Sequence, residues 1–102
     1  MAQIFPSKDP RRTWKGYQIY FFPQEYRPIN GKTLELLHLH FKGQTGEIEI
    51  YLKDLENLQI SPQWGKISQT DQNEIKKFVK KNHNDIMILI KIKLEKAGIA
   101  FN

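Results

Sequence analysis

The sequence predicts an α+β domain: an antiparallel three-stranded sheet, at about 16–22, 34–42 and 46–52, with a long C-terminal helix, at about 70–97, packed on its apolar face. Two observations support this fold class. Three segments of the first half alternate apolar and polar residues, as a strand with one buried face does. The last third spaces its apolar residues at about 100° per residue, as an amphipathic helix does. Residues 1–102 have the length of a single domain, with 1–15 as an extended basic N-terminal arm.

The three predicted strands differ in how clearly they are marked. GYQIYFF alternates large β-forming residues and ends at Pro23, because proline cannot donate a ladder hydrogen bond. LELLHLHFK places Leu37, Leu39 and Phe41 on one face and its histidines on the other. GEIEIYL follows the turn GQTG and alternates isoleucine with glutamate. The last two segments therefore predict a β-hairpin.

The register of this hairpin follows from its pattern, since opposed residues of an antiparallel pair share a face. Apolar residues meet when Phe41 opposes Ile48 and Leu39 opposes Ile50. The same register places three polar pairs on the other face: Lys42 with Glu47, His40 with Glu49 and His38 with Tyr51. A shift of two residues instead opposes the histidines to Glu47 and Glu49. In both registers the two histidines lie beside carboxylates, on the less apolar face.

The segment 53–69 is expected to be a connection that Trp64 pins to the core. Ser68 or Thr70 can cap the helix that follows, and Gly98 can end it. The expected apolar stripe of that helix is Ile75, Phe78, Val79, Ile86, Leu89, Ile90 and Ala97. An alternative remains open, because Asn82–Asp85 resembles a turn and 86–94 also alternates like a strand.

Composition narrows the functional classes. The chain has a formal net charge of +5 and no cysteine, which excludes disulfides, thiolate metal sites and thiol nucleophiles. Its charge is polarised, at +4 over 1–32, −3 over 33–60 and +4 over 61–102. Basic segments favour contact with polyanions. No segment is typical of a signal peptide or a membrane span, so we expect a cytoplasmic protein without membrane contact, and nothing in the sequence indicates a cofactor.

The order of these segments resembles a family of small bacterial proteins catalogued as domain of unknown function 4160. The resemblance rests on GYQIYFF, a proline-bearing loop, HLHFKGQTGEIEIYL and a charged C-terminal helix, over about Lys15 to Leu94. It implies an α+β fold and a genomic neighbourhood reminiscent of toxin–antitoxin pairs. It implies no established activity.

The His-x-His pair allows three interpretations. Residues two apart on a strand project to the same face, so His38, His40 and Glu49 are candidate metal ligands. With Tyr51, the same residues are candidate catalytic groups of a metal-independent ribonuclease, in which a base, an acid and a cation act on a phosphate. The simplest interpretation is two surface imidazoles beside carboxylates.

The favoured function is a non-catalytic binding or regulatory module of toxin–antitoxin or defence type, which contacts nucleic acid or a partner protein that handles it. If the protein is an enzyme, a ribonuclease is expected; a His-x-His metal-binding protein is the other alternative. A homodimer or hetero-complex through the C-terminal helix is a further hypothesis, since Met87, Ile88 and Ile92 lie outside the apolar stripe. The candidate nucleic-acid contacts are Arg11, Arg12, Lys15, Arg27, Lys76, Lys77, Lys80 and Lys81.

Overall fold

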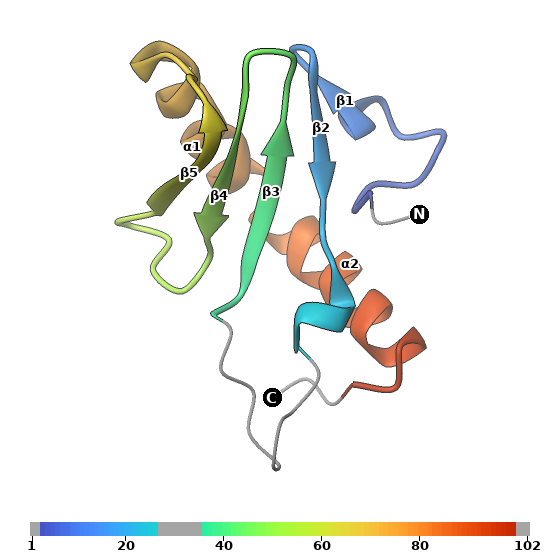
Figure 1. Ribbon diagram of the computed structural model, residues 1–102. Coiled ribbons are helices and arrows are strands. Elements are labelled where there is room, and N and C mark those ends of the chain that lie inside the picture. Colours follow the sequence, from blue (N-terminus) through green and yellow to red (C-terminus); the bar gives the residue numbers. More distant parts are fainter. Residues whose placement is uncertain (1–2, 27–35, 100–102) are drawn as a thin grey trace.

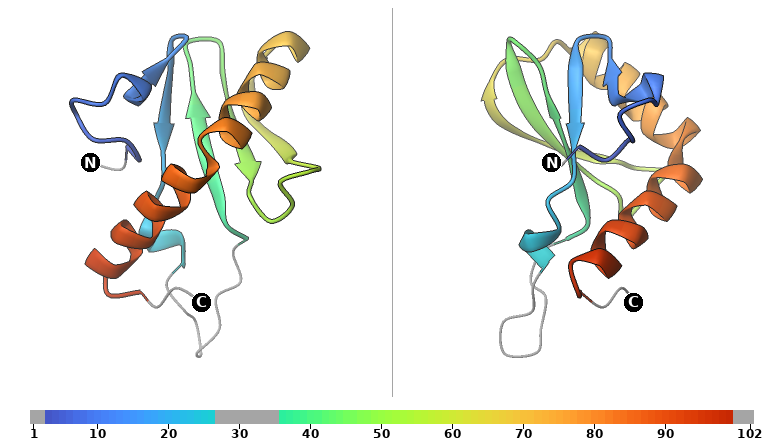
Figure 2. Two further views of the ribbon diagram at one scale, coloured as in Figure 1. Left: turned by 180° about the vertical axis from the view of Figure 1, so that it is seen from behind. Right: turned by 90° about the vertical axis from the view of Figure 1, so that its right-hand side faces the viewer.

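The computed structural model describes residues 3–26 and 36–99, which form a sheet of five antiparallel strands and two α-helices. The strands lie side by side in chain order: β1 (Thr13–Trp14), β2 (Tyr17–Tyr20), β3 (His38–Lys42), β4 (Gly46–Tyr51) and β5 (Gln59–Gly65). Two short 3-10 turns, η1 (Pro10–Arg12) and η2 (Pro23–Tyr26), flank β1 and β2. The helices α1 (Gln69–Lys81) and α2 (His83–Lys96) run end to end, diagonally across one face of the sheet (Figure 1, Figure 2). The predicted α+β class is therefore confirmed.

The predicted three-stranded sheet is wrong, because β1 and β5 add a strand at each edge. The strand β5 lies where a connection was expected. Its sequence QISPQWG did not predict a strand, because a proline normally argues against one. An edge strand tolerates Pro62 because its outer side needs no ladder donor. A β-bulge between Glu47 and Ile48 shifts the register with β5. Trp64, expected to pin this segment to the core, is 46% exposed.

The predicted register of the β3–β4 hairpin is confirmed. Phe41 opposes Ile48, Leu39 opposes Ile50 and His40 opposes Glu49. This register keeps the apolar side chains on the face that the helices cover, where Phe41 meets the ring of Phe78 on α1. It places the alternate side chains of β3 and β4, both histidines among them, on the opposite face.

The single helix expected over 70–97 is divided in two at Asn82. Asn82 has φ −104° and ψ 14°, and its side-chain amide donates to the carbonyl of Phe78, which ends α1. The amide of Ile86 then donates to the Asn82 carbonyl at 2.9 Å, so the second helix starts without a loop. Residues 83–96 are helical, and the strand alternative for 86–94 is therefore wrong.

The core lies between the sheet and the helices and also includes the N-terminal segment. Ile4 and Phe5 are buried, and Gln3 forms an isolated bridge with Tyr20 of β2. The helices contribute Ile75, Phe78, Val79, Ile86, Ile90 and Leu94. Within the part of the chain that the structure describes, neither helix has the length and apolarity needed to cross a membrane.

The Tyr17 hydroxyl joins β2 to the first turn of α1 by donating to Asp71 Oδ2 at 2.7 Å. Burial, together with this hydrogen bond, raises the pKa of Tyr17 to about 12, against about 10 for a free tyrosine. Above pH 10 the unfolded chain loses this proton while the folded protein keeps it, so stability is expected to fall as pH rises from about 10 to about 12. Ultraviolet titration should show a tyrosine that ionises near pH 12.

Three variants check that assignment. Asp71→Asn removes the neighbouring negative charge and is expected to move the Tyr17 transition toward lower pH. Tyr20→Phe should leave that transition in place, because Tyr20 lies on the other face of the sheet. An unchanged high-pH region of the titration curve in Tyr17→Phe would refute the assignment.

Candidate metal centre

The candidate site lies on the sheet face opposite the helices and is built by β3, β4 and the turn η2. His38 and His40 project from β3 to the same side, because residues two apart on a strand share a face. Glu47 and Glu49 project to that side from β4, where Glu49 lies directly opposite His40. Glu25 reaches the histidines from η2, which turns the chain back after β2.

The two histidines are buried, although they lie on the sheet face away from the helices. His38 is 1% exposed and His40 7%. The ring of Phe22 packs edge-on against His40 at 4.8 Å, and the rings of Tyr26 and Tyr51 lie 5.8 Å and 5.2 Å from His38. The interpretation of two surface imidazoles is therefore wrong, since aromatic side chains enclose the pair.

The backbone fixes the proton of His38 on one ring nitrogen. His38 Nδ1 lies 2.7 Å from the carbonyl oxygen of Leu36 and 3.0 Å from the Tyr26 hydroxyl. A carbonyl oxygen only accepts hydrogen bonds, so Nδ1 carries the proton and donates to it. In a neutral imidazole the other nitrogen, Nε2, then presents a bare lone pair.

That lone pair faces two more acceptors. His38 Nε2 is buried without a hydrogen-bond partner and lies 3.3 Å from Glu25 Oε1 and 3.6 Å from Glu49 Oε2. A bare nitrogen and a carboxylate oxygen repel each other at this distance. A positive species between them relieves this repulsion: a proton, on the ring or on one of the carboxyl groups, or a metal ion.

His40 repeats the arrangement. Its Nδ1 lies 3.1 Å from Glu47 Oε2, and its Nε2 lies 3.2 Å from Glu25 Oε1. A neutral imidazole has one N–H and can donate to only one of these carboxylates. When the N–H is on Nδ1 and donates to Glu47, Nε2 carries no hydrogen and its lone pair faces Glu25. The nitrogen His38 Nε2 is in the same situation.

The four inner side chains converge on one small volume. Glu25, His38, His40 and Glu49 each offer a ligand atom, and these atoms all lie within 4.8 Å of one another. Metal–ligand bonds of about 2.0–2.1 Å in a tetrahedral site separate neighbouring ligand atoms by about 3.3 Å. The nitrogen–oxygen distances of 3.2, 3.3 and 3.6 Å lie close to that separation.

Outer groups hold the carboxylates in place. The Tyr51 hydroxyl donates to Glu49 Oε1 at 2.8 Å, and the indole N–H of Trp64 donates to Glu47 Oε1 at 3.3 Å. Glu47 in turn holds His40 through its other oxygen. Outer contacts of this kind fix the tautomer and orientation of the ligands in metal sites.

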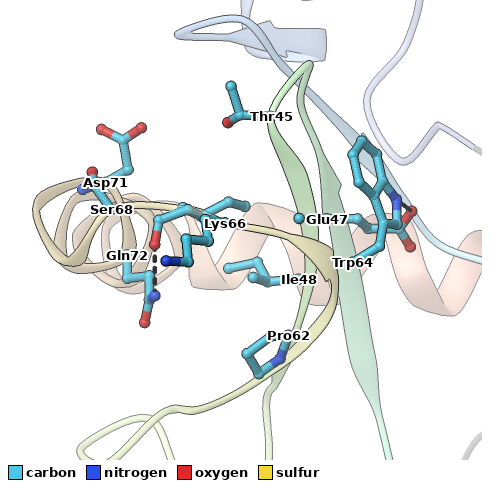
Figure 3. A pocket seen from close by; sticks show the side chains of 11 residues that line it. Thr45, Glu47, Ile48, Pro62, Trp64, Lys66, Ser68, Asp71 and Gln72 are labelled. Atoms are coloured by element: carbon cyan, nitrogen blue, oxygen red, sulfur yellow. Dashed lines mark hydrogen bonds between the residues drawn. The ribbon is translucent and has the colours of Figure 1, made fainter.

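A neighbouring pocket of about 630 Å³ lies between β5 and the start of α1 (Figure 3). Three of its polar side chains already have partners: Asp71 accepts from Tyr17, Gln72 donates to the Ile67 carbonyl, and Glu47 accepts from Trp64. Figure 3 shows Trp64 and Glu47 together at one side of this pocket. We therefore regard the pocket as a border of the histidine cluster rather than as a separate site.

The sequence identified three of the four converging residues. His38, His40 and Glu49 were candidate ligands, whereas Glu25 was missed, because it belongs to a turn whose return to the sheet has no periodic signal. Tyr51, a candidate catalytic group, supports Glu49.

The candidate nucleic-acid contacts are divided among several places. Arg11, Lys15, Lys77 and Lys81 line one pocket. Arg12 contacts Gln3, Lys76 and Lys80 lie on α1, and Arg27 is outside the described residues.

Comparisons of the chain with protein-family models, with curated proteins and with solved structures found no match. The resemblance to the domain of unknown function 4160 family stays a prediction.

Proposed function

We propose that this protein binds a divalent transition-metal ion through His38 Nε2, His40 Nε2 and the carboxylates of Glu25 and Glu49. One observation carries the proposal: His38 Nε2 is buried, has no hydrogen-bond donor and points at two carboxylate oxygens. Charge supports it as well. With Glu47, three carboxylates surround two imidazoles, and a doubly positive ion offsets most of that negative charge.

The ligand set indicates the class of metal. Two imidazole nitrogens and two carboxylate oxygens suit Zn²⁺, Fe²⁺ and their neighbours, whereas Ca²⁺ and Mg²⁺ prefer sites made of oxygen alone. Glu25 is the most exposed of the four side chains, at 31%, and the others are at 16% or below. An ion therefore enters and leaves beside Glu25.

The site also suits metal binding better than phosphate cleavage. A metal-independent ribonuclease needs a cation beside its acid and base to stabilise the extra phosphate charge. Among the described residues, the ion pairs of His38 and His40 are with carboxylates. A bound metal ion would instead join η2 to the sheet, so its first effect is on the structure and affinity of that region.

Calorimetric titration of chelator-treated protein with Zn²⁺ tests the proposal. We expect one equivalent to bind with a dissociation constant below about 1 μM, which corresponds to about −8 kcal/mol. His38→Ala combined with His40→Ala is expected to weaken binding by at least about 100-fold. His83→Ala, which removes the third histidine on α2, is the matched control and should bind like the unaltered protein. Equal affinity in the double variant and the control would refute the site.

A further inference from the structure

A second site lies on the helix-covered side of the molecule, between the β1–β2 turn and the C-terminal half of α1. It is a pocket of about 350 Å³. Trp14 lies in its wall and packs against the rings of Phe78, at 4.8 Å, and Phe41. The charged side chains that line this basic pocket are Arg11, Lys15, Lys77, Lys81 and Glu74.

The charges of the basic pocket are unbalanced. Glu74 is the one carboxylate among its lining residues. It is shared by two lysines, since Lys15 Nζ lies 3.8 Å from Glu74 Oε2 and Lys77 Nζ lies 3.9 Å from Glu74 Oε1. Arg11 is held in place by Asp9 at 2.7 Å and Asp85 at 2.9 Å. The lysines therefore remain as the cations that an anionic ligand can bind.

The backbone at Lys15 provides a second, independent observation. Lys15 has φ 51° and is the one non-glycine residue with positive φ in the part of the chain that the structure describes. In two-residue hairpin turns this position favours asparagine, because the Cβ of an L-residue crowds the backbone at positive φ and the short asparagine side chain offsets that cost by local hydrogen bonding. The strained turn places Lys15 Nζ 5.4 Å from the centre of the Trp14 ring, at the pocket.

The cations continue beyond the pocket. Lys77 and Lys81 are four residues apart and lie on one face of α1, one turn from each other. Lys76 and Lys80 extend the basic surface on the same helix. A row of cations matches a chain of phosphates better than a single small anion, and an aromatic ring beside such a row is where a base stacks in single-strand binding proteins.

We propose that the basic pocket binds a single-stranded nucleic acid, with Lys15, Lys77 and Lys81 on its phosphates and the Trp14 ring beside a base. The site is separate from the metal centre, because the two lie on opposite faces of the sheet. The proposal therefore does not depend on metal binding.

Fluorescence anisotropy with a labelled oligodeoxythymidine of about 12 nucleotides tests the proposal over a series of salt concentrations. The triple variant Lys15→Gln, Lys77→Gln, Lys81→Gln is expected to bind at least about 10-fold more weakly, with a salt slope smaller by about 2. The control is Lys53→Gln, Lys91→Gln, Lys96→Gln, which makes the same change in net charge outside the pocket. This control should lose less than about 3-fold.

Two single variants separate a binding role from a structural one. Glu74→Gln frees Lys15 and Lys77 from their shared carboxylate and is expected to strengthen binding. Lys15→Asn relieves the strained turn and is expected to weaken binding while it maintains or raises the melting temperature. If Lys15 had only a structural role, a variant with an unchanged or higher melting temperature would not bind the oligonucleotide more weakly.

Three results would overturn the proposal. The first is the absence of an anisotropy change at low salt. The second is an equal loss in the pocket and control triple variants, which would show a response to net charge alone. The third is tighter binding of a duplex of the same length, which would show that the protein does not prefer single strands.

Discussion

Zn²⁺ at about 1,000 times its dissociation constant is expected to raise the melting temperature by about 15 °C or more. A ligand at that excess stabilises the folded state by about 4 kcal/mol when it does not bind the unfolded chain. In a domain of this size each kcal/mol moves the melting temperature by about 4–8 °C. An ion at the site would also remove the repulsion between His38 Nε2 and the oxygens of Glu25 and Glu49, which adds to the stabilisation.

Differential scanning calorimetry with and without chelator measures this shift. His38→Ala is expected to abolish it, whereas His83→Ala should retain it in full. Binding should also weaken as pH falls, since protons compete with the metal for the imidazoles. A shift of the same size in His38→Ala, or with Mg²⁺ in place of Zn²⁺, would contradict a specific site at these residues.

Phe41→Ala is expected to destabilise the protein by about 3–5 kcal/mol, the usual cost of removing a large buried aromatic side chain. Phe41 is fully buried and contacts the rings of Trp14 and Phe78, so its removal opens a cavity between the sheet and α1. Domains of this kind have about 5–15 kcal/mol of total stability. The variant therefore loses a large fraction of it.

Urea unfolding followed by circular dichroism measures the change. Ile88→Ala is the control, because Ile88 is 59% exposed and its truncation removes little buried surface. We expect less than about 1 kcal/mol for that variant. Comparable losses in the two variants would show that Phe41 does not hold the sheet against α1.

The local parts of this fold could be predicted from the sequence. The β3–β4 register follows from alternation alone, because any one-residue slip would expose Leu39 and Phe41. The same alternation placed His38 and His40 on one face beside carboxylates. These features depend on residues close together in the chain, where the pattern acts directly.

The rest depended on contacts between distant segments. Phe22 and Tyr26 help to bury the histidines and Glu25 supplies the fourth ligand, and all three residues follow the end of β2. Sequence alternation does not report how such a turn folds back over a sheet. The strand β5 was missed for another reason, since its pairing with β4 overrides a proline that normally argues against a strand.

Of the functions expected from the sequence, metal binding is the one that the geometry of the histidine cluster supports. Two structural observations support metal binding: Glu25 lies with the three ligands expected from the sequence, and His38 Nε2 is buried without a hydrogen-bond partner. The role as a toxin–antitoxin or defence module, and pairing through the C-terminal helix, stay predictions. A partner that binds α2 would meet Ile88 and Ile92, which are exposed.

The proline in β5 also affects how copies of this protein behave toward one another. An exposed edge strand offers unpaired backbone groups to any neighbouring chain, which is a route to aggregation. Pro62 has no N–H to offer such a neighbour, and the bulge beside it, where Gln63 is the extra residue between Pro62 and Trp64, interrupts the regular spacing of the remaining groups. The irregular sequence QISPQWG, which made the strand hard to predict, is therefore expected to make the open edge of the sheet a poor partner for a strand of a neighbouring molecule.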